Sequence, residues 1–110
     1  MLRIGAIVLK VSDTERASSF WGRALNYEPR PGNPDFVRSG DGSAPEIHVD
    51  ADDRTHLDLW TDSVAEQRAE VDRLVALGAT EVDWDYPDDA DFVVLADPDG
   101  TLFCIIDTSA

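Results

Sequence analysis

A histidine and an aspartate stand two residues apart in the segment His56-Leu57-Asp58-Leu59-Trp60-Thr61. On a β-strand, side chains two apart share a face, and these two are spaced roughly 7 Å along it. An imidazole and a carboxylate so placed are candidate catalytic groups, acting as acid and base through a substrate or a water. In the simpler alternative, His56 only makes a hydrogen bond while Asp58 pairs with Lys10. The sequence leaves both interpretations open.

The elements that position such residues can be followed from the N-terminus. Residues 4–11 are rich in β-branched side chains, which favour a strand. Ser12 and Glu15 follow with capping-box spacing, and Asn26 stands where a left-handed cap residue is favoured. The apolar stripe expected between them consists of Ala17, Phe20, Trp21, Ala24 and Leu25. A strand therefore leads into an amphipathic helix over about 13–26.

The second half repeats this order. The strand 56–61 leads into a helix in which Ser63 and Glu66 repeat the capping-box spacing. Leu77-Gly78 closes that helix, which is about one turn longer than the first. Its apolar stripe consists of Val64, Val71, Leu74 and Val75.

Three strands are predicted after each helix. They lie at 26–30, 36–38 and 46–49 in the first half and at 81–86, 92–95 and 101–106 in the second. Glycines mark the turn at 39–42, and Asp-Pro-Asp-Gly at 97–100 is typical of a type I turn. The chain thus predicts an α+β fold of two βαβββ repeats, about 1–50 and about 55–108. A ferredoxin-like two-layer sandwich is the alternative, but it needs fewer strands than the turns supply.

Length and charge limit the function further. At 110 residues the chain suits a single domain over 1–110 whose repeats share one core. A net charge of -14 repels phosphate backbones and anionic lipids, so we expect neither nucleic acid nor membrane as a partner. One Cys allows no intrachain disulfide, and the N-terminal apolar stretch is too short to span a bilayer. We therefore expect a cytoplasmic protein.

Several short motifs, in this order and spacing, resemble the vicinal oxygen chelate superfamily, the group of glyoxalase, bleomycin-resistance and extradiol-dioxygenase proteins. They are Val11-Ser12-Asp13, Phe20-Trp21, His56-Leu57-Asp58-Leu59, Leu77-Gly78-Ala79 and Asp97-Pro98-Asp99-Gly100. The resemblance covers essentially the whole chain, and the short glyoxalase-like proteins of the superfamily are the most similar. It implies a curled, cup-shaped mixed sheet with both helices on the outside and the ligand inside. It also implies a homodimer.

Strand parity then sorts the residues that would face such a cup. If the helices cover Leu57 and Leu59, the opposite face presents His56, Asp58 and Trp60. The ligand-binding residues expected from both repeats are Lys10, His48, His56, Asp58, Trp60, Leu102, Cys104 and Ile106. Trp21 belongs to the helix stripe and the core, whereas the facing of Trp84 is left open.

The resemblance also implies where a metal would be held, typically by two His and one Glu. These positions fall on Ala6, His56 and Cys104, so two of the three expected ligands are missing. A catalytic metal usually needs three protein ligands, and we therefore expect none here. The alternative is a zinc-compatible set in which His48 and Cys104 join His56.

The sequence therefore predicts a glyoxalase-like protein that binds a small, partly apolar molecule without a metal cofactor, by sequestering it or turning it over slowly. The first alternative is a divalent-metal-dependent lyase, isomerase or dioxygenase acting through His56. The second is a protein-interaction domain, because a fold does not fix a function.

Overall fold

The computed structural model describes residues 1–109, which form two helices and eight strands. The first repeat consists of β1 (Arg3–Lys10), α1 (Thr14–Leu25), β2 (Glu28–Arg30), β3 (Asn33–Arg38) and β4 (Glu46–Asp50). The second consists of β5 (His56–Thr61), α2 (Val64–Ala76), β6 (Thr80–Glu81), β7 (Phe92–Ala96) and β8 (Leu102–Asp107). The predicted α+β class and the order βαβββ in each repeat are confirmed.

The chain divides into two compact units. The first unit runs from Gly5 to His56, and the second combines Met1–Ile4 with the described residues from Leu57 on. The division thus falls inside two strands, after Ile4 in β1 and after His56 in β5. The two units follow the two repeats apart from these strand ends. That the repeats share a single domain stays a prediction.

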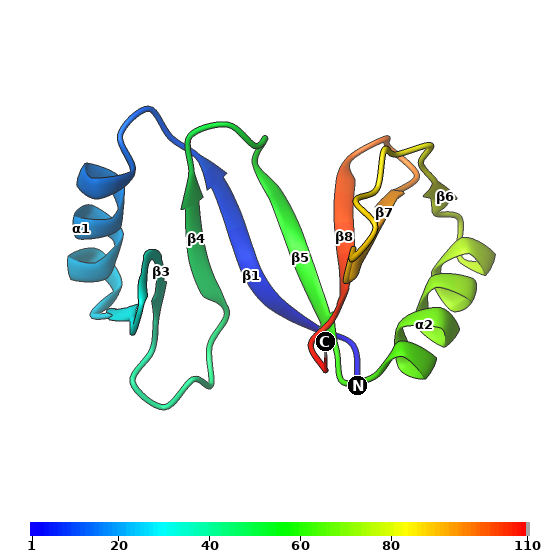
Figure 1. Ribbon diagram of the computed structural model, residues 1–110, viewed down its shortest axis with the longest axis horizontal. Coiled ribbons are helices and arrows are strands. Elements are labelled where there is room, and N and C mark those ends of the chain that lie inside the picture. The colour runs from blue at the N-terminus through cyan, green and yellow to red at the C-terminus, as the bar shows by residue number, and fades with distance from the viewer. Residues whose placement is uncertain (110) are drawn as a thin grey trace. The chain divides into compact units, whose positions relative to one another are not determined.

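The first unit is a four-stranded sheet covered by one helix. Its strand order is β2-β3-β4-β1, with β1 and β4 parallel and the other pairs antiparallel. Figure 1 shows α1 beside β3 and β4. Val37, Ile47 and Val49 form the buried core, and Ala17 and Trp21 of α1 pack against it. Burial of this apolar layer holds the helix on one face of the sheet.

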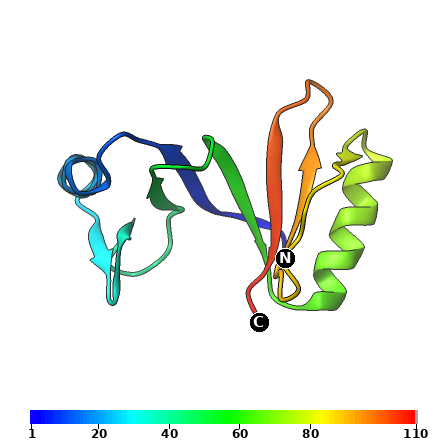
Figure 2. The ribbon, with the colours of Figure 1, turned by 45° about the horizontal axis from the view of Figure 1, so that its top comes forward.

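The second unit repeats this plan. Its strand order is β5-β8-β7-β6, with β5 and β8 parallel and β7 antiparallel to both of its neighbours. In Figure 2, α2 runs alongside the sheet of this unit, where it contacts β8. The core consists of Val71 of α2, Leu95 of β7 and Ile105 of β8. Here the helix itself contributes a buried side chain, Val71.

The helix ends differ slightly from the prediction. The N-cap of α1 is Asp13 and not Ser12, because the Asp13 carboxylate accepts the backbone N–H of Arg16 at 3.0 Å. Ser63 caps α2 as predicted, accepting the N–H of Glu66. Asn26 ends α1 in the left-handed conformation with φ 56°, where its side chain is tolerated better than most.

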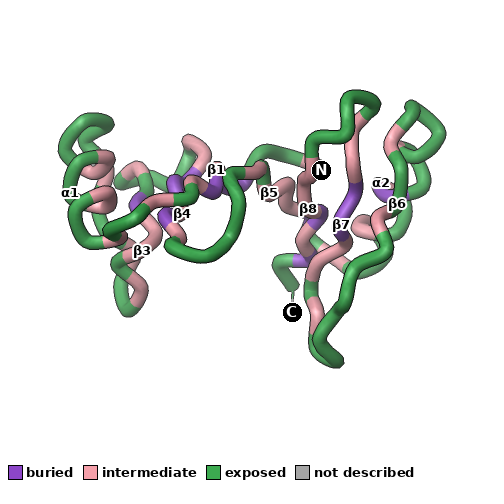
Figure 3. The backbone as a smooth tube through the Cα atoms, turned by 90° about the horizontal axis from the view of Figure 1, so that it is seen from above, coloured by how far each residue is buried: buried purple, intermediate pink, exposed green. Residues whose placement is uncertain are grey.

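The predicted apolar stripes are only partly buried. Phe20 and Leu25 of α1 are 61% and 42% exposed, and Val64 and Val75 of α2 are 60% and 42% exposed. Figure 3 accordingly shows exposed surface along much of both helices, with the buried residues concentrated on the strands. Only one side of each stripe therefore meets its sheet.

The strand predicted over 81–86 is much shorter in the structure, where β6 covers only Thr80–Glu81. Beyond it, the Tyr86 hydroxyl accepts the backbone N–H of Val94 at 2.7 Å. The Val94 N–H is thus bonded to a side-chain hydroxyl, whereas in a longer β6 strand it would be bonded to a backbone carbonyl. The predicted turn at 97–100 is confirmed, since Gly100 N–H donates to the Asp97 carbonyl. Within residues 1–109, neither helix is long and apolar enough to cross a membrane.

Candidate functional site

The pairing of β5 with β8 builds a sheet face that points away from α2. Asp58 lies opposite Cys104 and Trp60 opposite Ile106, whereas Leu59 and Ile105 point into the core beneath α2. The side chains on the outer face are all half-buried: His56, Asp58, Trp60, Leu102, Cys104 and Ile106. We call these six residues the β5–β8 face. It combines three apolar side chains with three polar or ionisable ones.

The three polar residues of the β5–β8 face converge. His56, Asp58 and Cys104 each offer one potential metal-ligating atom, and these atoms lie within 4.8 Å of one another. His56 and Asp58 belong to one continuous strand, and Cys104 pairs directly with Asp58. Strand parity correctly placed His56 and Asp58 side by side. His48, which the sequence suggested as a third ligand, is not part of this cluster.

The His56 imidazole is held in one orientation. Its Nδ1 lies 2.7 Å from the backbone carbonyl oxygen of Arg54. A carbonyl can only accept, so Nδ1 carries the proton and donates it, and in the neutral ring Nε2 keeps its lone pair. Asp53 Oδ2 lies 4.0 Å from Nε2, and the His56 side chain is only 9% exposed. The ring is therefore both enclosed and oriented.

Trp60 also has a cationic neighbour, because the Arg3 guanidinium carbon lies 5.8 Å from the centre of its ring. That distance is within the range of a cation–π contact. Arg3 forms a further ion pair with Asp62 at 3.1 Å. This edge of the β5–β8 face is thus lined by charged side chains.

The two remaining predicted ligand-binding residues lie on the sheet of the first unit. Lys10 is exposed at the end of β1, where its backbone N–H donates to the Thr55 hydroxyl. His48 lies on β4 and stacks on Phe36, with ring centres 3.9 Å apart and planes 11° apart. Its Nε2 is 3.9 Å from the Asp50 carboxylate.

A set of contacting side chains that the sequence analysis did not identify lies on the same sheet as His48. Arg30 donates to the carboxylate of the buried Glu46 at 2.6 Å, and its guanidinium carbon lies 3.9 Å from the centre of the Phe36 ring. We call Arg30, Phe36, Glu46, His48 and Asp50 the Arg30 network. The alternation of Glu46, His48 and Asp50 with apolar Ile47 and Val49 was the signal that could have grouped three of its members on one face.

The Asp50 carboxylate ends this network in a turn. It accepts the backbone N–H groups of Asp53 and Asp52 at 2.9 and 2.8 Å. These two hydrogen bonds are the main reason that its pKa lies below the ordinary value of 3.8, and the charges of His48 and His56 add to the effect. The connector 51–54, irregular in sequence, is thus ordered by a side chain of β4.

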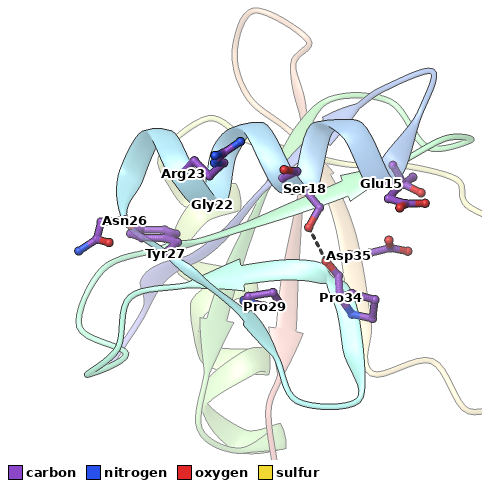
Figure 4. A pocket seen from close by; sticks show the side chains of 11 residues that line it. Glu15, Ser18, Gly22, Arg23, Asn26, Tyr27, Pro29, Pro34 and Asp35 are labelled. Atoms are coloured by element: carbon purple, nitrogen blue, oxygen red, sulfur yellow. Dashed lines mark hydrogen bonds between the residues drawn. The ribbon is translucent and has the colours of Figure 1, made fainter.

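A groove also lies between α1 and the β2–β3 hairpin. It has a volume of about 830 Å³, and Figure 4 shows the hydrogen bond from the Ser18 hydroxyl to the Pro34 carbonyl that bridges it. Glu15 and Arg23, two of its charged residues, are exposed to solvent. Its lining residues include none of the three side chains that converge on the β5–β8 face.

The comparisons with known proteins agree on one fold. A family model described as glyoxalase-like domain matches residues 6–106. A Vibrio splendidus 12B01 structure described as a glyoxalase/bleomycin resistance protein/dioxygenase superfamily member has a TM-score of 0.55 and 18% identity, covering 97% of this chain and 98% of that one. No curated protein matches the chain.

Two further solved structures are similar at 14% identity. The NAD-dependent benzaldehyde dehydrogenase from Legionella pneumophila has a TM-score of 0.65, covering 92% of this chain and 96% of that one. The hypothetical protein BH1468 from Bacillus halodurans C-125 has a TM-score of 0.60, covering 99% and 96%. At these identities the likeness shows the fold alone.

Proposed function

Because this chain belongs to the family of glyoxalase-like domains, we propose that it binds a small, partly apolar molecule on the β5–β8 face. The observation that supports this most strongly is the strand register, which gathers His56, Asp58 and Cys104 beside Trp60 and Ile106. Small-molecule sites are mostly apolar surfaces with a few polar groups that fix orientation. The β5–β8 face has this composition.

Each kind of side chain has a separate role in this proposal. Trp60, Leu102 and Ile106 supply apolar contact, and the indole ring offers a flat surface on which an unsaturated ligand can stack. His56, Asp58 and Cys104 supply the polar groups that fix the orientation of the ligand. A ligand with an apolar body and an adjacent hydroxyl suits this arrangement.

A divalent-metal-dependent lyase, isomerase or dioxygenase is the second candidate. The specific observation in its favour is the convergence of His56, Asp58 and Cys104. The ligand set that the resemblance implied does not fit this chain, because Ala6 is a buried apolar residue and Cys104 offers a thiol in place of a carboxylate. Metal chemistry here would therefore need a different set of ligands.

A fragment screen by amide NMR tests the binding proposal. Isotope-labelled protein, treated with a chelator, is mixed with a panel of small aromatic and short-chain alcohols and acids, and its amide shifts are recorded. We expect bound fragments to shift amides of β5, β7 and β8. Trp60→Phe keeps an aromatic ring but removes the larger indole. It should weaken fragment binding about three- to tenfold, since an aromatic stacking contact contributes about 1 kcal/mol.

The groove between α1 and the β2–β3 hairpin serves as the internal control for this screen. Fragments that shift only amides around Ser18 and Tyr27 contradict the proposal, and so does a panel that shifts none. Tyr27→Phe, which changes the lining of that groove, should leave fragment affinity unchanged. An expected homodimer is checked separately by sedimentation equilibrium.

A further inference from the structure

We propose that the groove between α1 and the β2–β3 hairpin binds a small organic amine, in which an ammonium group is attached to an apolar body. The volume of the groove, about 830 Å³, is within the usual range of small-molecule sites. All of its lining residues belong to the unit Gly5–His56, and none of them is part of the β5–β8 face. The groove is therefore a separate candidate site.

Two carboxylates lie at the same end of the groove. Glu15 is in the first turn of α1. Asp35 directly follows Pro34, whose carbonyl oxygen accepts a hydrogen bond from the Ser18 hydroxyl at 2.7 Å. Because Ser18 is about one turn after Glu15, this bond holds Asp35 beside the beginning of the helix. We call Glu15 and Asp35, which Figure 4 shows at one end of the groove, the acidic end.

The two carboxylates of the acidic end have no partner of their own. Among residues 1–109, neither forms a hydrogen bond or an ion pair with another residue. The carboxylates of Asp13 and Asp50, in contrast, accept backbone N–H groups. An ammonium group has three N–H donors and suits two carboxylates that line one end of a groove. The net charge of -14 adds to the attraction of a cation.

Apolar and rigid side chains line the groove next to the acidic end. Tyr27 is half-buried, and its hydroxyl donates to the Pro45 carbonyl at 3.0 Å, which fixes the orientation of the ring. Pro29 and Pro34 line the hairpin side of the groove. Proline rings lose little conformational freedom when a ligand packs against them. These side chains therefore offer a preformed contact surface for an apolar body.

The charges also give the groove a direction. Arg23 lines it at the last turn of α1, about 12 Å from Glu15 along the helix axis. A second ammonium group at that end would lie near the Arg23 guanidinium and be repelled by it. The groove therefore suits a monoamine better than a diamine.

The second repeat has a groove of different charge beside its helix. Arg68 and Glu81 are the charged residues that line it. Arg68 is five residues after the N-cap Ser63 (68 − 63). The equivalent position in the first repeat is Ser18, five residues after the N-cap Asp13 (18 − 13). A guanidinium in the lining disfavours an ammonium ligand, so we expect the amine to bind in the first repeat only.

A comparison of three probes that share a phenylbutyl body tests the proposal. Phenylbutylamine carries a cation, phenylbutanol a neutral hydroxyl and phenylbutyrate an anion. Amide shifts of the isotope-labelled wild type are recorded with each probe at neutral pH and low ionic strength, where surface charges are least screened. We expect the amine to shift amides of 14–35, and the alcohol and the acid to leave them unchanged. Equal shifts from all three probes, or no shift from the amine, overturn the proposal.

Neutral variants of the acidic end sharpen the test. Glu15→Gln and Asp35→Asn should each weaken amine binding about two- to fivefold, and the double variant about tenfold. Glu28→Gln is the matched control, because Glu28 is an exposed carboxylate of the same hairpin that does not line the groove. It should leave the affinity unchanged. If Glu28→Gln weakens binding as much as Glu15→Gln does, the amine follows only the overall charge and the proposal is wrong.

The wild-type comparison decides the question even if a variant fails to fold. It is also independent of the proposed function, because the fragment panel contains alcohols and acids but no amine. Amine shifts at 14–35 without fragment shifts on β5, β7 and β8 would reject the proposal for the β5–β8 face alone. The opposite result would reject the amine site alone.

Discussion

The two repeats share one backbone plan but use their outer sheet faces differently. In the first, Arg30 pairs with Glu46 and covers Phe36, while His48 stacks on the same ring. In the second, donor atoms of three residue types converge beside apolar side chains. Polar groups that satisfy one another stabilise a surface, whereas converging donors on a fixed register can hold a ligand. Duplication of a fold therefore need not duplicate its chemistry.

The cores underneath differ much less. Each consists of three buried aliphatic residues where one helix packs against its sheet. The cores depend on a pattern of apolar residues that both repeats keep, whereas the outer faces depend on individual residues. Substitutions at equivalent positions can therefore separate what the fold needs from what the site needs.

The largest expected effect comes from substitutions at Val8 and Asp58. These two positions are equivalent in the two repeats, because each lies five residues before the N-cap of its helix, Asp13 (13 − 8) or Ser63 (63 − 58). Val8→Asp places a carboxylate at a position that is 2% exposed, and it should lower the free energy of unfolding by about 3 kcal/mol or more. The reverse change, Asp58→Val, should cost about 1 kcal/mol or less, because Asp58 is only half-buried. Urea unfolding of both variants measures the difference. Equal losses would show that the two faces are not distinct.

A smaller effect is expected from the Arg30 network. Arg30→Met leaves the buried Glu46 carboxylate without its cation and should cost about 2 kcal/mol. The double variant Arg30→Met/Glu46→Leu should recover most of that loss, because both charges then leave together. Arg3→Met in the second unit is the control, since the Arg3–Asp62 pair is exposed to solvent and should contribute much less to stability. Equal losses for Arg30→Met and Arg3→Met would mean that the network is not structural.

The smallest expected effect is pH-dependent and belongs to Asp50. The pKa of its carboxyl lies below 3.8 because of the Asp53 and Asp52 N–H groups. The resulting stability is present above that ordinary value and is lost as the pH falls through the lower folded-state pKa. Asp50→Asn should therefore be less stable than the wild type at neutral pH, with the gap closing in acid. Thermal unfolding from pH 7 to pH 3 checks this, and a gap that stays constant contradicts it.

Local sequence signals predicted most of the fold. The alternation of 56–61, the cap at Ser63 and the glycine-containing turns each depend on neighbouring residues, and β5 has the predicted bounds. The errors came where distant residues decide. Apolar and acidic residues alternate over 81–86 as in a strand, yet the Tyr86 hydroxyl accepts the backbone N–H of Val94 that a longer strand would have used. Phe20 fits the helix stripe, yet the sheet beneath α1 does not reach it.

The candidate site shows the same limit. Parity alone placed His56 and Asp58 on one face, because both lie on a single strand. It could not show that Cys104 lies opposite Asp58, since the register of β5 and β8 depends on core packing between segments more than forty residues apart. Arg30 was missed for a similar reason, because its partner Glu46 lies sixteen residues further along the chain.

The division inside β1 has a consequence for the order of folding. Leu2 packs against the core formed by Val71, Leu95 and Ile105. During synthesis the chain grows at about 5 to 20 residues per second, so Leu2 is added roughly 5 to 20 seconds before Ile105. The first unit can form meanwhile, but the second cannot be completed until its last strand arrives. Leu2 is therefore made well before the residues that become its native neighbours.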